Sequence, residues 1–377
     1  MTSSGFDGKL ALQQRVLTPY RAALFDMLAA ACRGGLSVCA GLPRLEESIA
    51  VTEHLNLAEF FPIQNVHLLR GRGYLCYQRG LPAWLERCAA EALIVEANPR
   101  YLATPAAVRW MKRRGKAVIG WGLGAQPPSG TSHFLQKWWE RGRQARRAAF
   151  LRPFDAMITY SQRGAEQYAR LGFPAERIFI APNAAVARPT RPAPFRRPEW
   201  REQPNVLFVG RLQARKRVDL LLQACAALPA LLQPRLVIVG DGPERSRLER
   251  LAQSLYPAAV FTGGKHGDEL AAYFSAADLF VLPGTGGLAV QEAMSYGLPV
   301  IMGQGDGTNA ELVRPGNGWQ IPPDDLTALT RTLVMALADA QHLRRMGAES
   351  YRIVSEEVNL ERMVEVFLQA LESVSKK

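Results

Sequence analysis

Leu282–Ile301, with the sequence LPGTGGLAVQEAMSYGLPVI, is the stretch that decides the fold. A short apolar segment ends in a glycine-rich turn, and the turn opens a segment with the composition of a helix. Gly297 ends that helix and Pro299 prevents its continuation, so a second strand begins at once. This order of strand, helix and strand is typical of an α/β fold.

The glycine-rich turn is suited to binding an anion. The first backbone N–H groups of a helix have no partner within the helix, and they point at whatever lies above the turn. Glu292 lies one helical turn after Leu288, where its carboxylate can accept hydrogen bonds from hydroxyl groups. The two features together predict a site for a nucleotide sugar, which presents a diphosphate beside a ribose.

A second strand-glycine unit lies upstream. The apolar segment Val206–Val209 runs into Gly210, and Arg211 and Lys216 stand near the start of a predicted helix over 218–228. A guanidinium and an ammonium group near a helix N-terminus provide the charge that a diphosphate needs. Taken singly, each of these charged residues is better explained as a solvated surface group, so the interpretation depends on their joint spacing.

The order and spacing of these motifs resemble the family 4 glycosyltransferases, closely over 204–338 and more loosely over 155–183. The resemblance implies a retaining enzyme in which Arg211 and Lys216 bind the donor diphosphate and Glu292 binds the ribose, and these three are the predicted catalytic residues. The donor-binding residues that it implies are Gly210, Arg211, Lys216, Gly264, Lys265, Thr285, Gly286, Gly287, Leu288 and Glu292.

The chain departs from the family at one position. The family motif has two glutamates separated by seven residues, and the first of them falls on Gly284 here. In the family that acid usually helps to hold the transferred sugar. Two alternatives therefore stay open, a GT-B-like epimerase or phosphorylase and a catalytically silent homologue that acts as a binding partner. Product analysis with and without acceptor, and slow donor hydrolysis, would separate them.

The length and the pattern of strands predict two domains. A chain of 377 residues is too long for one ordinary core. Strand and helix candidates alternate on both sides of a proline-rich, basic segment, which predicts two Rossmann-like domains facing across a cleft, the GT-B fold of the family. The expected boundaries are 1–187 for an acceptor domain, 188–204 for a linker, 205–358 for a nucleotide-sugar domain and 359–377 for a helix that returns to the first domain.

Composition and motifs indicate the compartment of the protein and its need for cofactors. No stretch approaches the roughly 20 apolar residues of a membrane-spanning helix, and no secretory signal is visible. The five cysteines form no Cys-x-x-Cys pair, which favours reduced thiols in a cytoplasmic protein. No Asp-x-Asp motif and no histidine pair with metal-ligand spacing occurs, so we expect no metal and no other cofactor.

The positive charge is concentrated in the first half of the chain. Residues 1–190 contain 25 Lys and Arg against 13 Asp and Glu, whereas 191–377 contain 21 of each kind. Tryptophans alternate with basic residues within 108–153, the pattern of a helix lying on an anionic membrane, although solvated arginines and buried tryptophans explain it equally well. The residues predicted to form the acceptor or membrane face are Arg15, Trp138, Trp139, Arg143, Arg146 and Arg147.

These observations predict a hexosyltransferase that moves a sugar from a nucleotide diphosphate sugar to a saccharide or lipid-linked acceptor. The expected setting is surface polysaccharide, lipopolysaccharide or glycolipid assembly at the inner face of the plasma membrane. No nucleic acid is expected as a partner, because no recognised nucleic-acid module accompanies the basic charge.

Overall fold

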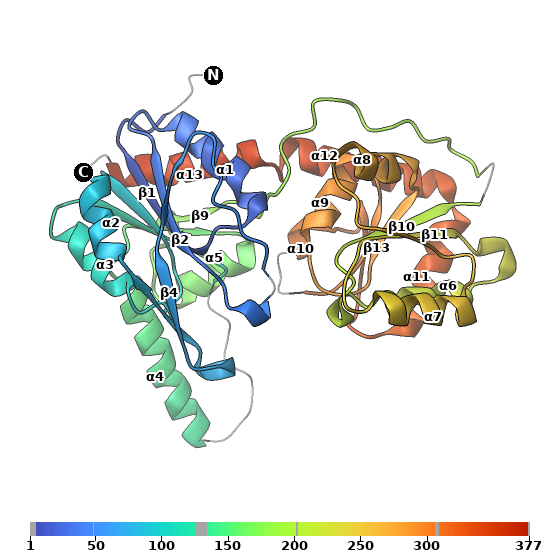
Figure 1. The fold of residues 1–377 in the computed structure, drawn as a ribbon, viewed down its shortest axis with the longest axis horizontal. Coiled ribbons are helices and arrows are strands. Elements are labelled where there is room, and N and C mark those ends of the chain that lie inside the picture. Colours follow the sequence, from blue (N-terminus) through green and yellow to red (C-terminus); the bar gives the residue numbers. More distant parts are fainter. Residues whose placement is uncertain (1–4, 48, 125–133, 201–202, 306–308, 376–377) are drawn as a thin grey trace. The chain divides into compact units, whose positions relative to one another are not determined.

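The computed structural model describes residues 5–375, apart from 48, 125–133, 201–202 and 306–308, and only the backbone of 72, 134–141 and 309–310 (Figure 1). The chain forms two compact units. The first contains Met1–Asn183 together with Leu360–Lys377, and the second contains Ala184–Asn359. Each unit is built on a parallel sheet of the doubly wound type, and each is described here by itself.

The first unit has a seven-stranded sheet in the order β3-β2-β1-β6-β7-β8-β9, with every neighbouring pair parallel. Its strands are β1 (Leu10–Val16), β2 (Leu36–Gly41), β3 (Glu59–Pro62), β6 (Ala92–Glu96), β7 (Ala117–Gly122), β8 (Ala156–Thr159) and β9 (Ile178–Ile180), and β4 (Gln64–Leu68) with β5 (Leu75–Arg79) forms a separate antiparallel pair. Strands buried on both faces have apolar sequences throughout, which is why most of them were predictable.

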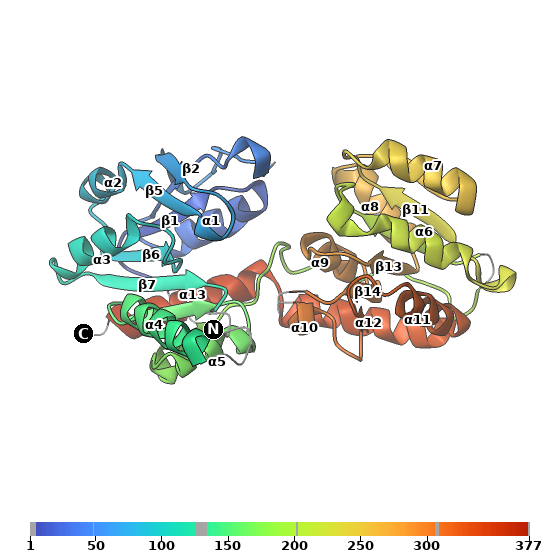
Figure 2. The ribbon, with the colours of Figure 1, turned by 90° about the horizontal axis from the view of Figure 1, so that it is seen from below.

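Helices cover both faces of this sheet (Figure 2). Side chains of α2 and α3 pack with Leu93 and Val95 of β6 in one buried cluster, whereas α13 lies beside α1 and against β7 to β9. Because successive side chains of a strand point to opposite faces, these two groups of helices cover opposite sides. The helices are α1 (Pro19–Ala31), α2 (Leu81–Cys88), α3 (Thr104–Lys112), α4 (Phe134–Leu151), α5 (Gln162–Arg170) and α13 (Leu360–Ser375), with short 3₁₀ turns η1 (Leu45–Glu47), η2 (Gly71–Gly73) and η3 (Ala175–Arg177).

The second unit has a six-stranded parallel sheet in the order β12-β11-β10-β13-β14-β15. This is the Rossmann order, in which the chain reverses direction across the sheet between β10 and β13, and ligands bind at the carboxyl ends of the strands beside that point. Its elements are β10 (Asn205–Val209), η4 (Ala214–Lys216), α6 (Val218–Ala226), η5 (Ala230–Leu232), β11 (Arg235–Val239), α7 (Arg245–Leu255), β12 (Val260–Gly263), α8 (Gly267–Ala276), β13 (Leu279–Leu282), α9 (Leu288–Ser295), β14 (Val300–Gly303), α10 (Asn309–Leu312), β15 (Gly318–Ile321), α11 (Leu326–Ala338) and α12 (Ala340–Glu356).

The proline-rich segment that was expected to be a linker belongs to the second unit. The guanidinium of Arg196 donates to the backbone oxygens of Ala277, Tyr296 and Phe274, at 2.7, 2.8 and 3.0 Å. The indole of Trp200 donates to the backbone oxygen of Leu337 at 3.0 Å. Much of the segment is therefore anchored to the surface of this unit.

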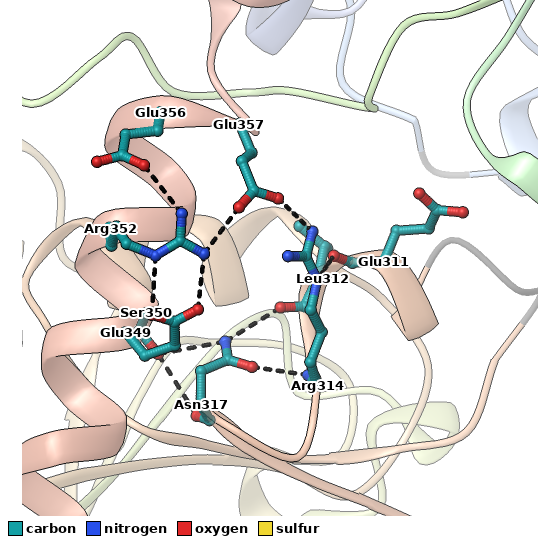
Figure 3. Close-up of polar contacts among 9 residues, drawn as sticks. All are labelled: Glu311, Leu312, Arg314, Asn317, Glu349, Ser350, Arg352, Glu356 and Glu357. Atoms are coloured by element: carbon teal, nitrogen blue, oxygen red, sulfur yellow. Dashed lines mark hydrogen bonds and ion pairs between the residues drawn. The ribbon is translucent and has the colours of Figure 1, made fainter.

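A polar network fixes the turn before β15 to α12, the helix that packs against α9 (Figure 3). Arg314 pairs with Glu357 at 2.7 Å, and Asn317 donates to the backbone oxygen of Leu312 and to the hydroxyl of Ser350. Arg352 pairs with Glu349, Glu356 and Glu357. Exposed pairs of this kind contribute little stability individually, so we assign the network a positioning role.

Candidate donor site and a cavity in the first unit

Two loops meet at the carboxyl ends of β10 and β13, where the strand order of the second unit reverses. One loop, 210–217, follows β10, and the other, 283–287, joins β13 to α9. They carry most of the predicted donor-binding residues. The structure therefore brings together two motifs that lie about 70 residues apart in the sequence, at the place where this kind of sheet binds ligands.

The absence of a side chain at Gly284 is required by how closely the two loops approach. A Cβ atom at this position would lie 2.1 Å from the backbone oxygen of Arg215, and the N–H of Thr285 donates to the same oxygen at 3.0 Å. No glutamate fits at position 284 unless the loops separate. The loss of the first family acid is thus coupled to a tight contact between the two loops.

Lys216 is a half-buried cation in this site. Its ammonium group lies against Gly286, where an added Cβ would be only 2.2 Å from Nζ. Burial, together with the nearby charge of Arg215, lowers the pKa of Lys216 to about 8. Among the described residues, no carboxylate lies within 4.0 Å of this nitrogen. A cation that is desolvated and lacks a counter-ion favours the binding of an anion.

The other residues of the two loops differ in their surroundings. Arg211 is exposed on the loop after β10. Arg215 donates to Gln213 at 3.0 Å and to the hydroxyl of Thr285 at 3.4 Å, so its guanidinium joins the two loops. Gly287 is the residue before the first turn of α9, which Leu288 begins. The first N–H groups of that helix therefore open next to Lys216 and Thr285.

Glu292 is a half-buried carboxylate on α9. Burial raises its pKa, and no donor to its carboxylate oxygens is found among the described residues. The adjacent Gln291 is buried and accepts a hydrogen bond from the N–H of Ala185 at 2.7 Å, so its amide has a structural role. Glu292 by contrast keeps its acceptor capacity for a ligand hydroxyl.

Lys265 and Gly264 follow β12 and lie farther along the same edge of the sheet. The ammonium of Lys265 pairs with Glu269 of α8 at 3.4 Å, and an added Cβ at Gly264 would meet no atom within 4 Å. The structure thus gives Lys265 a partner of its own, and its predicted contact with the donor remains a prediction.

The residues predicted for the acceptor or membrane face differ in their surroundings. Arg15 is held by carboxylates, since its guanidinium pairs with Glu47 at 2.8 Å and its N–H donates to Glu96 at 3.2 Å. Arg143 and Arg146 are exposed on α4, whereas Arg147 lines a cavity. The side chains of Trp138 and Trp139 lie outside the part that the structure describes.

That cavity, of about 590 Å³, lies in the first unit at the carboxyl ends of β6, β7 and β8. The sequence motifs did not reveal it, because its polar residues are distant in the chain. They include Arg21 in the first turn of α1, Glu96 at the end of β6, Trp121 in β7 and Tyr160 after β8. Polar residues directly after buried strands were the one available signal.

The described residues contain neither a metal-binding cluster nor a membrane-spanning helix. No group of three or more His, Cys, Asp and Glu side chains there could hold a metal ion. No helix among them has the length and apolar character that a membrane span requires.

Comparison with known proteins identifies the second unit. Residues 191–353 match the sequence model of the family described as glycosyl transferases group 1. By sequence, the second unit is a group 1 glycosyltransferase domain. The predicted resemblance to family 4 glycosyltransferases is thereby confirmed.

Among curated relatives, the group 1 glycosyltransferase domain is similar to the GDP-mannose-dependent alpha-mannosyltransferase of Mycobacterium tuberculosis, with 46% identity over 116 residues that cover 30% of this chain and 28% of the relative. It is 41% identical over 109 residues to the sulfoquinovosyl transferase SQD2 of Arabidopsis thaliana, covering 28% and 20%. These matches span less than a third of either relative's own length.

Solved structures match nearly the whole chain. The lipopolysaccharide outer core galactosyltransferase WaaB, in its apo form, superimposes with a TM-score of 0.66 at 15% identity, covering 96% of this chain and 99% of that one. Anabaena Alr3699/HepE in complex with UDP gives a TM-score of 0.68 at 17% identity, covering 97% and 99%. At this identity the likeness shows the fold, and the expected GT-B fold of two Rossmann-like domains is confirmed.

Proposed function

We propose that this protein is a retaining hexosyltransferase that moves a sugar from a nucleotide diphosphate sugar to a saccharide or lipid-linked acceptor. The observation that carries the proposal is the half-buried ammonium of Lys216, which has no carboxylate partner among the described residues and lies between two loops that approach closely at glycines. The family match and the similarity to GDP-mannose-dependent enzymes support it.

In this reaction the second unit stabilises the leaving diphosphate. Lys216 and Arg211 contact the phosphates, and the first N–H groups of α9, at Gly287 and Leu288, face the β-phosphate. Glu292 accepts a hydrogen bond from the ribose. The two cations take over the charge that develops on the leaving group, and we propose that neither a metal ion nor another cofactor is needed.

Retention follows in the proposal from the family resemblance. The bond from the sugar to the diphosphate breaks, the acceptor oxygen bonds to the sugar on the same face, and the departing phosphate takes the acceptor's proton. Because no side chain fits at Gly284, the transferred sugar must be held by groups elsewhere.

The setting that we propose is glycolipid or polysaccharide assembly at the cytoplasmic face of a membrane. Similarity to a phosphatidylinositol monomannoside mannosyltransferase of Mycobacterium tuberculosis, 29% identical over 213 residues and covering 52% of this chain, supports a lipid-linked acceptor. The exposed Arg143 and Arg146 of α4 support contact with anionic lipid.

A screen of nucleotide sugars by thermal shift and by donor hydrolysis tests the proposal. One of them should stabilise the protein, by about 2.7 kcal/mol at 100 times its dissociation constant. Lys216→Ala or Arg211→Ala should lower the turnover of that donor by about 100-fold or more, since removing one such donor of hydrogen bonds costs about 2.7–4 kcal/mol.

The matched control is Lys9→Ala, which removes a lysine of the first unit that pairs with Glu59 at 3.2 Å. Full activity of both Lys216→Ala and Arg211→Ala would refute the assignment of the site. Binding of nucleotide without any hydrolysis or transfer would instead favour the alternative of a catalytically silent homologue. That alternative depends on Gly284, which stands where the family has its first glutamate.

A further inference from the structure

The cavity of the first unit has the size and the position of a ligand site. Its volume of about 590 Å³ lies within the roughly 300–1,000 Å³ of small-molecule pockets. It opens at the carboxyl ends of β6, β7 and β8, beside the point where the strand order reverses between β1 and β6. In sheets of this type that place binds ligands.

Arg21 is the most deeply placed charge in this cavity, with 5% of its surface exposed. Its guanidinium donates to the hydroxyl of Tyr160 at 3.1 Å, to the side-chain oxygen of Asn183 at 2.7 Å and to the sulfur of Met363 at 3.6 Å. All three acceptors are neutral. Within the residues that the structure describes, no carboxylate lies within 4.0 Å of this guanidinium.

Aromatic rings enclose the same group. The guanidinium carbon of Arg21 lies 5.0 Å from the ring centres of Tyr20 and Trp121, and 5.5 Å from that of Tyr160. The rings fix the direction of the cation but leave it without a counter-ion. A buried charge in that condition is costly, and an anion entering the cavity would offset the cost.

A second observation also indicates a ligand. The indole N–H of Trp121, which lines the cavity and is 2% exposed, has no hydrogen-bond partner among the residues that the structure describes. Buried polar groups are almost always paired in native proteins, so an unpaired donor in a cavity is suited to a ligand acceptor. The charged side chains that line the cavity are Arg21, Arg100, Arg147 and Glu96.

We propose that this cavity recognises the acceptor by an anionic group, a carboxylate or a phosphate carried on a saccharide, which Arg21 binds with the indole N–H of Trp121 beside it. The inference deepens the proposed glycosyl transfer and rests on it. Glu96 lies in the same cavity, where its carboxylate can accept hydrogen bonds from the acceptor's hydroxyl groups.

The test titrates the full-length protein, in buffer without phosphate, with three hexoses that differ only at carbon 6: glucose, glucuronate and glucose 6-phosphate. We expect at least one charged hexose to bind about tenfold or more tightly than glucose, because hydrogen bonds to a buried charge are among the strong ones. The comparison of glucuronate with glucose 6-phosphate, and competition by inorganic phosphate, separates the two anions.

Variants assign the preference to Arg21. Arg21→Gln should reduce it to near unity, Arg21→Lys should keep part of it, and Arg113→Gln, an exposed arginine at the end of α3, should keep all of it. Because a buried substitution can prevent folding, the indole N–H resonance of Trp121, assigned with Trp121→Phe, is followed in the unsubstituted protein. It should move on addition of the preferred hexose and stay in place with glucose.

Equal affinity for all three hexoses, no binding of any of them, or a preference that survives Arg21→Gln would overturn the inference. Binding of UDP and GDP is measured in the same samples, because it depends on the second unit. If the unsubstituted protein binds UDP or GDP but shows no preference among the hexoses, only this inference is refuted. If the unsubstituted protein binds neither nucleotide, the proposed function is refuted.

Discussion

At the scale of single residues, Lys216 links the chemistry of the candidate donor site to pH. Burial lowers its pKa from the ordinary 10.5 to about 8, so the free protein loses this positive charge as the pH rises through about 8. A bound diphosphate needs the charge. The affinity for UDP or GDP should therefore fall above pH 8, as measured by titration calorimetry between pH 6.5 and 9.5.

Substitutions separate this effect from other titrations. Lys216→Arg keeps a charge that does not titrate in this range and should flatten the fall in affinity, whereas Lys9→Arg, in the first unit, should leave the fall unchanged. The stability of the free protein depends on pH in the opposite direction to its nucleotide affinity. The unfolded chain holds the Lys216 proton more tightly, so this group makes the free energy of unfolding rise as the pH increases from about 8 to 10.5.

A second prediction at the scale of single residues concerns Gly284. In Gly284→Ala the new Cβ would lie 2.1 Å from the backbone oxygen of Arg215, so the two loops must move apart. We expect a loss of about 1–3 kcal/mol in the free energy of unfolding and weaker nucleotide binding, measured by urea unfolding and titration. Gly316→Ala is the control, because its Cβ would make only an ordinary contact with Glu349. Equal effects of the two substitutions would contradict the loop contact.

At the scale of elements, α4 is the candidate for membrane contact. Its exposed Arg143 and Arg146 should each contribute about 1 kcal/mol to binding an anionic surface, so replacing both with Gln should weaken binding to phosphatidylglycerol vesicles by about 2 kcal/mol. Cosedimentation at low and high salt measures it, since screening weakens the attraction. Arg79→Gln with Arg235→Gln, an equal loss of exposed charge outside 108–153, should have little effect. Comparable binding to neutral vesicles would exclude an electrostatic origin.

The sequence allowed the buried elements to be predicted closely. The predicted apolar segment Val206–Val209 is found as the strand Asn205–Val209, because a strand with both faces covered is a continuous apolar run between turn signals. Two edge strands, β3 and β15, were missed. Glu59–Pro62 is half exposed and ends in proline, and Gly318–Ile321 begins with glycine, so neither has the apolar pattern on which the prediction relied.

The candidate site likewise contains some features that the sequence predicted and others that it did not. Lys216 and Thr285 could be placed in neighbouring loops because each follows a recognisable strand and glycine. The partners of Arg15 and Lys265 could not be foreseen, since the carboxylate of Glu47 reaches Arg15 only through the tertiary fold. The cavity around Arg21 depends on residues from several helices, strands and loops, and no local pattern brings these residues together.

At the scale of the whole molecule, the first unit is assembled from two separate parts of the chain. The buried face of α13 contributes Leu360, Met363, Phe367 and Leu371 to it, and Phe367 meets the Trp121 ring at 4.9 Å. Each such side chain contributes about 1.5–3 kcal/mol when buried, which together rivals the roughly 5–15 kcal/mol stability of a domain.

Fragments test this organisation. Residues 184–359 should unfold cooperatively by themselves, as followed by circular dichroism, because the second unit is continuous in the chain. The chain cut after residue 359 should keep that transition and lose the transition of the first unit. Adding α13 as a synthetic peptide should restore it in part, and an unaffected first unit in the truncated chain would show that α13 is dispensable.

The return of α13 also sets an order of events during synthesis. A ribosome releases the first 183 residues early, yet the sulfur of Met363 and the ring of Phe367, which contact Arg21 and Trp121, emerge only after the whole second unit. The nascent first unit must therefore wait, partly unpacked, while its later neighbour folds. Chaperones should bind this waiting intermediate, and slow codons after residue 359 should prolong its exposure to proteases.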